Sequence, residues 1–416
     1  MMSIREDADR IIRQSIREML PNEAVERALK QKNLEGNVVV VAVGKAGWTM
    51  GNTAKTVLGD QVKKGVIVTK YEHSQGDIEG FTIIEAGHPV PDENSVLGTE
   101  KAIEAVSGLT EQDTVVFLIS GGGSALFERP LEGITLDDIQ DVTKQLLRCG
   151  ADIVEINTIR KHLSAVKAGR FAKLCAPAKV YAIVLSDVLG DRLDSIASGP
   201  AYPDSSTCEE ALAIVKKYGL TFDERIISRL GQETPKELDN VETVITGSVS
   251  ELCRAAAKEA EVLGYTPYIL TSTLDCEAKE AGKMLSSIAR EIKSNPGCAF
   301  KAPCAVIMGG ETVVRITGEG LGGRNQELAL SAADGIADLG DTVVFSIGSD
   351  GTDGPTDAAG GMVDGATRKR LSEKNLQIGE VLAQNDSYRA LKEAGDLIIT
   401  GPTGTNVNDV AVLLIK

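Results

Sequence analysis

The sequence predicts an α/β protein of two domains, each built on a mainly parallel β-sheet. Runs of β-branched and other aliphatic residues alternate along the chain with segments whose apolar residues have helical spacing, which is the rhythm of strands joined by crossover helices. At 416 residues, the chain is also longer than a single domain usually is. A polar segment rich in turn-forming residues, 231–240, lies between two such series. We therefore expect domains over residues 1–235 and 236–416.

The expected elements follow one another at short intervals. Strand-like runs occupy 37–44, 64–70, 81–87, 113–123, 178–187, 241–248, 266–272, 302–311, 312–320 and 341–351. Helical patterns fill 92–107, 135–148, 251–263, 276–294 and 324–338. An amphipathic helix that ends at Pro21 is expected before the first strand. The apolar run 407–416 has the pattern of a last strand, which could return to either domain, the N-terminal one included.

The composition excludes several kinds of partner. The chain has 44 Lys and Arg against 60 Asp and Glu, a net charge of −16, so we expect no nucleic acid partner. No apolar run approaches the roughly 18 residues that a membrane span needs, and the N-terminus lacks the apolar stretch of a secretory signal. We expect no membrane partner and a cytoplasmic location. The seven cysteines lack metal-type spacing and are expected to be buried and unpaired.

Glycine gives the clearest functional signal. Of the 43 glycines, 19 fall within six short stretches: 44–51, 120–126, 309–312, 318–326, 348–361 and 401–406. Four of these stretches directly follow a strand run. In parallel α/β sheets, ligands bind outside the carboxyl ends of the strands, so the clusters predict shaped binding loops rather than disorder.

Two of these loops in the first half suit an anion. Gly44 and Lys45 join a strand to a helix, which offers free backbone N–H groups beside one ammonium, without matching the P-loop or the dinucleotide-binding fingerprint. The three glycines at the end of the strand run 113–123 can form a nest of N–H donors around an oxyanion or a phosphate. The residues that we expect to bind phosphate or substrate here are Gly44, Ser120, Gly121, Gly122, Gly123 and Ser124.

Two charged residues elsewhere in the first half are further candidates. Arg160 lies in a basic run, 154–173, which is either a solvated helix face or a clamp for a carboxylate or phosphate, to which a bidentate arginine is suited. Asp187 directly follows a strand, where an α/β enzyme holds Mg²⁺ or a general base. The residues alone do not separate these two roles.

The second half repeats the pattern. Arg324 and Asn325 begin a helix behind a glycine pair, and an arginine at such a place can meet the charge of a transferring phosphoryl group. Asp350 lies in a glycine-rich loop after a strand and is a candidate metal or hydroxyl ligand. Asn406 is a neutral hydrogen-bonding residue. Anion cradles, cations and acids without a nucleophile or redox centre indicate phosphoryl transfer, which depends on positioning and charge neutralisation.

In order along the chain, eight segments resemble the class II (MOFRL-type) glycerate kinase family. They are GKAGWTMG (44–51), ISGGGSALF (119–127), INTIRKHLSAVKAGR (156–170), LSDVLGDRLDSIASGPAYPD (185–204), GGET (309–312), GGRNQELAL (322–330), GSDGTDGPTDAAGG (348–361) and GPTGTNVND (401–409). One departure is Ala168, where the family often has a glycine.

The resemblance implies two α/β domains with Rossmann-like sheets and an active-site cleft between them. It implies transfer of a phosphoryl group from ATP to D-glycerate with Mg²⁺ or another divalent cation, giving 2-phosphoglycerate, with Lys45 and Arg324 essential. In the mechanism that we expect, Lys45 and Arg324 neutralise the transferring phosphoryl group and Asp187 acts as base or metal ligand, with Asp350 as a second metal ligand. The alternatives are formation of 3-phosphoglycerate, an NAD(P)H-dependent hydroxypyruvate reductase and a non-catalytic sensor. The oligomeric state stays open between monomer and homodimer.

Overall fold

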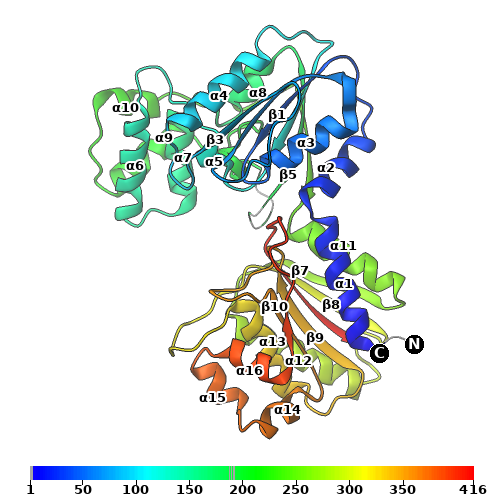
Figure 1. Cartoon of the computed structure of the whole chain (residues 1–416). Coiled ribbons are helices and arrows are strands. Elements are labelled where there is room, and N and C mark those ends of the chain that lie inside the picture. The colour runs from blue at the N-terminus through cyan, green and yellow to red at the C-terminus, as the bar shows by residue number, and fades with distance from the viewer. Residues whose placement is uncertain (1–2, 187, 189, 191–192) are drawn as a thin grey trace. The chain divides into compact units, whose positions relative to one another are not determined.

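The computed structural model describes residues 3–186, 188, 190 and 193–416 of the chain. It confirms an α/β protein of two domains. One compact unit is Pro21–Thr246, and the other combines Met1–Leu20 with Gly247–Lys416 (Figure 1). Among the described residues, no helix has both the length and the apolar composition that crossing a membrane requires.

The domain boundary differs from the expected one in two ways. It follows Thr246 instead of residue 235, because the strand β6 (Val241–Gly247) completes the first sheet. The first helix, α1 (Ile4–Glu18), belongs to the second unit, because its buried face packs on the helix α11 (Val249–Val262). In addition, Tyr265 donates a hydrogen bond to the buried Asp7 carboxylate (2.7 Å).

The Pro21–Thr246 unit has a six-stranded sheet in the order β3-β2-β1-β4-β5-β6. The remaining strands are β1 (Val38–Val43), β2 (Val62–Lys70), β3 (Phe81–Ala86), β4 (Thr114–Ile119) and β5 (Lys179–Leu185). β1 pairs in parallel with both β2 and β4, and β2 with β3 and β4 with β5 also run parallel. The carboxyl ends of these strands therefore meet at one edge, where the glycine loops after β1 and β4 lie.

Helices cover both faces of this sheet (Figure 1). They are α2 (Pro21–Lys30), α3 (Gly47–Leu58), α4 (Glu93–Val106) and α8 (Arg170–Cys175). Along β1, Val38, Val40 and Ala42 pack with α2 and α3, whereas Val39, Val41 and Val43 pack with α4 and α8. Because side chains alternate along a strand, an all-apolar strand such as β1 is buried on both faces.

A helical cluster extends from the unit beside the sheet. It consists of α6 (Leu136–Arg148), α7 (Ile153–Leu163), α9 (Cys208–Lys217) and α10 (Glu224–Leu230), packed on a core of their own. Two short elements, α5 (Gly123–Leu126) and the 3₁₀ helix η2 (Ile196–Ser198), lie against each other between this cluster and the sheet. The turn η1 (Gly59–Gln61) leads into β2.

The second unit has a mixed sheet in the order β11-β10-β9-β12-β8-β7, where we expected a mainly parallel one. Its strands are β7 (Thr266–Leu274), β8 (Cys304–Gly310), β9 (Thr342–Gly348), β10 (Gly360–Asp364), β11 (Leu397–Ile398) and β12 (Asp409–Ile415). β7 and β8 are parallel, but β12 runs antiparallel to both β8 and β9, and β10 antiparallel to β9. The reason is that β10 and β12 follow loops without a crossover helix. The last strand thus stays in the C-terminal domain.

The helices of this unit are α1, α11, α12 (Ala278–Ser294), α13 (Arg324–Gly335), α14 (Thr367–Glu373), α15 (Ile378–Ala383) and α16 (Ser387–Ala394). α12 and α13 share a core with alternate residues of β8 and β9, including Val306 and Val344. The strand expected over 312–320 is absent: apart from one bridge at Val313, the segment is a loop, with Ile316 81% exposed. An apolar run that lies in solvent cannot be told from a strand by composition.

Candidate active site

In the first unit, the loop after β1 lies directly against the loop after β4. Gly44 has a φ of 114°, and a Cβ on this residue would overlap the side chain of Ser120. The Gly44 N–H donates to the carbonyl oxygen of Val68 in β2 (3.1 Å). Only glycine allows both this conformation and this close approach. Gly44 therefore allows the carboxyl ends of β1, β2 and β4 to lie close together.

The backbone of Lys45 is anchored while its side chain remains in solvent. The Lys45 N–H donates to Gly121 O (2.9 Å), and the Ala46 N–H donates to Ser120 Oγ (3.1 Å). The Lys45 side chain is exposed, and its ammonium has no hydrogen-bond or ion-pair partner among the described residues. Its stem passes beside Gly122. The predicted cation therefore stands at the glycine nest, free for a ligand.

The loop after β4 has unoccupied backbone donors. Gly122 has a φ of 86°, and Gly123 donates its N–H to Ser120 O (3.3 Å). Within the described part of the chain, the N–H groups of Gly121 and Gly122 donate no hydrogen bond. Successive free N–H groups in a turn of this kind bind anions. The structure thus brings together all six residues that were predicted for this cradle.

Arg160 lies beneath this loop and supports it. Its Nη2 donates to Ser124 O (2.9 Å) and lies 3.6 Å from a carboxylate oxygen of the fully buried Glu128. With a side chain that is 11% exposed, Arg160 supports the loop through these contacts, and a clamp on the substrate stays a prediction.

A buried ion pair completes the support of the loop. Lys167 and Glu128 are both 0% exposed, with 2.8 Å between Lys167 Nζ and Glu128 Oε2, and Lys167 also donates to Phe127 O (3.0 Å). Burial lowers the pKa of Lys167 to about 8, against the opposing effect of the Glu128 charge. The pairing of these two residues was not predicted, because only the fold brings positions 128 and 167 together.

Described residues that follow β5 in the chain lie in the same region. Asp187, predicted as catalytic base or metal ligand, lies outside the described residues, and its role stays a prediction. Farther along, Ser198 of η2 forms hydrogen bonds with Ser124 and Asn157. A cavity of about 490 Å³ beside Asn157 is lined in part by Lys161, Asp194 and Ser195, and the Lys161 ammonium lies 3.0 Å from Asp204 and 3.6 Å from Asp194.

In the second unit, Arg324 is the first residue of α13 and carries two acidic partners. Its Nε and Nη2 donate to the two oxygens of Asp409 (2.6 and 3.2 Å), and its Nη1 donates to Glu311 (2.9 Å). The arginine side chain is 34% exposed. A two-pronged contact with a carboxylate fixes the plane of a guanidinium, so Arg324 is held in one orientation.

Asp409 was not among the predicted site residues. It is the first residue of β12, where it pairs with Gly310 and Gly348 at the ends of the two neighbouring strands. Burial raises the pKa of Asp409 to about 6, although the hydrogen bonds and charge of Arg324 act in the opposite direction. The sequence does show an acidic residue directly before the last apolar run. Its spacing does not, however, indicate that this residue pairs with Arg324.

Asn325, the residue after Arg324 in α13, is buried and bonded within the protein. It is 1% exposed, its N–H donates to Asp353 Oδ1 (3.1 Å), and its side-chain oxygen accepts from Ser346 (2.6 Å). The Asp353 carboxylate also accepts from the Gln326 N–H (2.9 Å), so it caps the first turn of α13, and burial raises its pKa. A Cβ on Gly323 would overlap this carboxylate. The buried amide of Asn325 orders the helix start, and its contact with substrate stays a prediction.

Asp350 and Asn406 lie on two loops that bond to each other. The carbonyl of Asp350 accepts from the Thr403 N–H (3.1 Å), and one of its carboxylate oxygens accepts from the Thr352 N–H (3.0 Å). Asn406 is exposed and accepts from the Asn408 N–H (3.2 Å). Asp350 is half-buried, next to the strand end that Asp409 pairs with. The structure therefore collects Arg324, Asn325 and Asp350 at one edge of this sheet.

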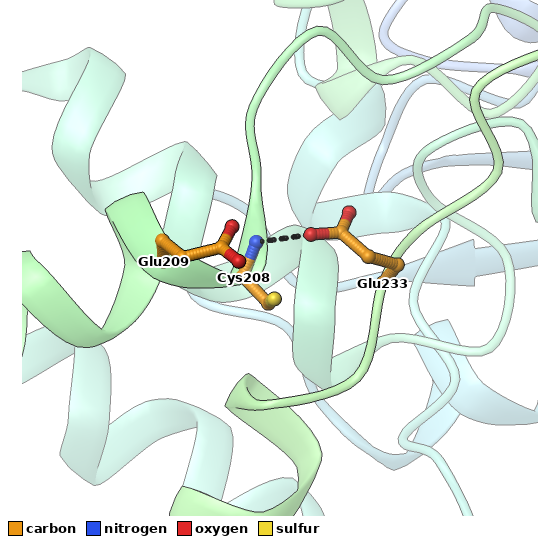
Figure 2. A group of neighbouring side chains, drawn as sticks. All are labelled: Cys208, Glu209 and Glu233. Carbon is orange, nitrogen blue, oxygen red and sulfur yellow. Dashed lines mark hydrogen bonds between the residues drawn. The ribbon is translucent and has the colours of Figure 1, made fainter.

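Among the described residues, one group of three has potential metal ligands close together, and it contains no predicted site residue. It consists of Cys208, Glu209 and Glu233 (Figure 2). Glu233 accepts the Cys208 N–H (2.8 Å) and pairs with Lys236 (2.8 Å). These contacts connect the start of α9 to the 231–240 segment, which accounts for the closeness of the three side chains without a metal.

Known proteins are similar to this chain over nearly its whole length. Residues 7–231 match the family described as a domain of unknown function, DUF4147, and residues 304–409 match the MOFRL family. The chain is 54% identical over 413 residues to a protein of Thermotoga maritima named D-glycerate 2-kinase. The alignment covers 99% of each chain. It is 43% identical over 436 residues to a glycerate 2-kinase of Pyrococcus horikoshii, with 100% of this chain and 98% of that one covered.

A solved structure gives the same result for the fold. The crystal structure of a glycerate kinase from Thermotoga maritima matches with a TM-score of 0.94 at 54% identity and covers 99% of each chain. Family, sequence and fold thus agree along the full length, and the chain belongs to the MOFRL-type, or class II, glycerate kinase family.

Proposed function

We propose that the protein is a D-glycerate 2-kinase, which transfers the terminal phosphoryl group of ATP to the 2-hydroxyl group of D-glycerate. The main support for the proposal is the position of Lys45. Its side chain is exposed, and its ammonium has no partner among the described residues, whereas its backbone is bonded to the loop that carries the free N–H groups. Such a nest binds the oxygens of a small anion. The full-length likeness to proteins named for this activity supports the choice of substrate.

The main predicted residues have the following proposed roles. The N–H groups of Gly121 and Gly122 hold the carboxylate of glycerate, since Arg160 already has Ser124 O and Glu128 as partners. Lys45 and Arg324 neutralise the charge of the transferring phosphoryl group, which is the main demand of this reaction. Asp409 and Glu311 orient Arg324 for that purpose. Asp187 takes the proton of the reacting hydroxyl group or binds the metal.

We also propose Mg²⁺ as the metal that accompanies ATP. Protein-bound Mg²⁺ usually takes one or two carboxylates and completes its shell with phosphate oxygens and water. Asp350 fits this requirement, because one of its oxygens accepts from Thr352 and the carboxylate is only half-buried. When bound, the metal would neutralise the phosphate oxygens of ATP. A cytoplasmic location remains part of the proposal and rests on the sequence alone.

The reductase alternative is not favoured. A dinucleotide-binding loop needs backbone space for a pyrophosphate after its first strand, but here Gly44 is closed against Ser120 and Lys45 N–H is bonded to Gly121 O. The geometry and the sequence of this loop therefore both count against a dinucleotide site.

The test is the release of ADP that depends on D-glycerate, followed in a coupled assay for the wild type and two variants. Removing an anion-stabilising group costs about 100-fold to 1000-fold in turnover, so Lys45→Ala and Arg324→Ala should each lower kcat at saturating substrates by about 100-fold or more. Lys63→Ala is the matched control, since Lys63 is an exposed lysine on the same unit whose ammonium donates to Asp60 O. Near-normal turnover in both variants would refute the assigned roles.

A further inference from the structure

The hydroxyl group of Ser124 belongs to a chain of three side chains. Ser198 Oγ donates to Asn157 Oδ1 (3.1 Å), and Ser124 Oγ lies 2.8 Å from Ser198 Oγ. A serine hydroxyl has one hydrogen to donate. Because Ser198 donates its hydrogen to Asn157, the hydrogen bond between the two serines must be donated by Ser124.

The middle of this chain is held rigidly. Ser198 is 0% exposed, and its backbone has a φ of 60°, next to Ala197 with a φ of 50°. A pair of non-glycine residues in the left-handed region is costly and persists only where the surroundings hold it. The carbonyl of Ser198 accepts the Ala168 N–H (3.1 Å), which ties it to a neighbouring segment. The Ser198 oxygen is therefore a fixed acceptor for Ser124.

Ser124 consequently offers a ligand lone pairs only. It is half-buried, two residues beyond the free N–H group of Gly122. An acceptor repels carboxylate and phosphate oxygens but accepts a hydrogen bond from a hydroxyl group. The loop thus combines donors for a carboxylate with one acceptor for a hydroxyl, which is the pattern of a small hydroxy acid.

The chain also cannot act as a base. A proton that entered it at Ser124 would have to leave through the side chain of Asn157, and an amide has no basic site near neutral pH. The hydroxyl group that contacts Ser124 is therefore one that keeps its proton during the reaction. In a 2-kinase, that group is the 3-hydroxyl group of D-glycerate.

We infer that Ser124, oriented by Ser198 and Asn157, accepts a hydrogen bond from the non-reacting 3-hydroxyl group of the substrate and so selects glycerate over hydroxy acids that lack it. The inference rests on the proposed function and specifies which atom of the site binds which atom of the substrate. It makes Ser124 a specificity residue, and Ser198 and Asn157 positioning residues.

The test compares two inhibitors that each lack one hydroxyl group of glycerate. D-Lactate keeps the 2-hydroxyl group, whereas 3-hydroxypropanoate keeps the 3-hydroxyl group. In Ser124→Ala, the KM for D-glycerate and the inhibition constant of 3-hydroxypropanoate should both rise about 10-fold, the size expected for one hydrogen bond. The inhibition constant of D-lactate should stay within about twofold of the wild type, because it never made that bond.

Two further variants separate this effect from loss of structure. Ser198→Ala leaves the Ser124 hydroxyl in place but removes its acceptor, so the KM for D-glycerate should rise less than in Ser124→Ala while kcat changes little. Ser205→Ala, which removes a serine bonded to Asp194 (2.8 Å) in the same unit, should change neither inhibition constant. Thermal unfolding checks that each variant is folded.

The outcomes are distinct for the two levels of the proposal. If the wild type does not phosphorylate D-glycerate, the proposed function fails. If it does, but Ser124→Ala leaves the KM for D-glycerate unchanged, weakens both inhibitors equally, or weakens D-lactate alone, the inference about the 3-hydroxyl group is wrong and the proposed function stands.

Discussion

Arg324 and Asp409 form the contact on which the chemistry of the second unit depends. A free arginine would sample many orientations, whereas the paired contacts to Asp409 hold the guanidinium at the start of α13. Asp409 can do this fully only as a carboxylate, and burial raises its pKa to about 6. Protonation of Asp409 removes the charge that orients Arg324, so activity should depend on pH in the window around that value.

The expected pH dependence follows from the sign of this shift. As the pH falls through about 6, Asp409 becomes neutral and kcat should fall, giving an acidic limb in the pH profile. Asp409→Asn should lower kcat by about 10-fold or more, as expected for a lost charged hydrogen bond, and abolish this limb. The control Glu311→Gln removes the more exposed partner of Arg324 and should keep it. An unchanged limb in Asp409→Asn would assign the titration to another group.

At the scale of elements, the loop after β4 rests on the buried pair of Glu128 and Lys167. Two opposite charges that are 0% exposed need each other, since removing one leaves the other uncompensated in the interior. Arg160 and the loop carbonyls share this network. The glycine nest therefore has a rigid base despite its glycine content.

Unfolding in urea measures how much this base contributes. Glu128→Gln should lower the free energy of unfolding by about 3–5 kcal/mol, because Lys167 is then buried without its partner. The double variant Glu128→Leu with Lys167→Met should recover much of that loss, since an apolar pair of similar size replaces two desolvated charges. A double variant that is as unstable as Glu128→Gln would show that packing around the loop, and not the charge, is responsible.

The elements also show how far the sequence alone could predict the site. Apolar strands and the glycines beyond them identified Gly44, Lys45 and the 120–124 loop, because strand period and turn chemistry are local. Glu128, Ser198 and Asp409 lie tens of residues along the chain from Lys167, Ser124 and Arg324, the residues that they contact, and no local pattern encodes such contacts. For the same reason, the antiparallel direction of β12 was not predicted, since its neighbours in the sheet are distant in the chain.

At the scale of the whole molecule, the chain does not divide where its polar segment suggests. The first helix belongs to the C-terminal unit, which it reaches through contacts such as Asp7 with Tyr265 and Lys416 (2.7 Å each). Its amphipathic pattern predicted a helix, but an apolar face does not specify which sheet it covers. The two ends of the chain thus stabilise one domain.

Hydrogen exchange can test this assignment on the full-length protein. Asp7→Ala leaves the buried Tyr265 hydroxyl without its acceptor and should lower the free energy of unfolding by about 1–3 kcal/mol. Faster exchange is expected in α1, α11 and β12, with β1 and β4 unchanged. Loss of protection in β1 to the same extent would contradict the division into these two units.

As a D-glycerate 2-kinase, the protein phosphorylates the 2-hydroxyl group of its substrate. Phosphorus NMR of the product formed from ATP, Mg²⁺ and D-glycerate tests it most directly. We expect 2-phosphoglycerate together with an equal amount of ADP. A spectrum with 3-phosphoglycerate as the first product, or with no new phosphate ester, would contradict it.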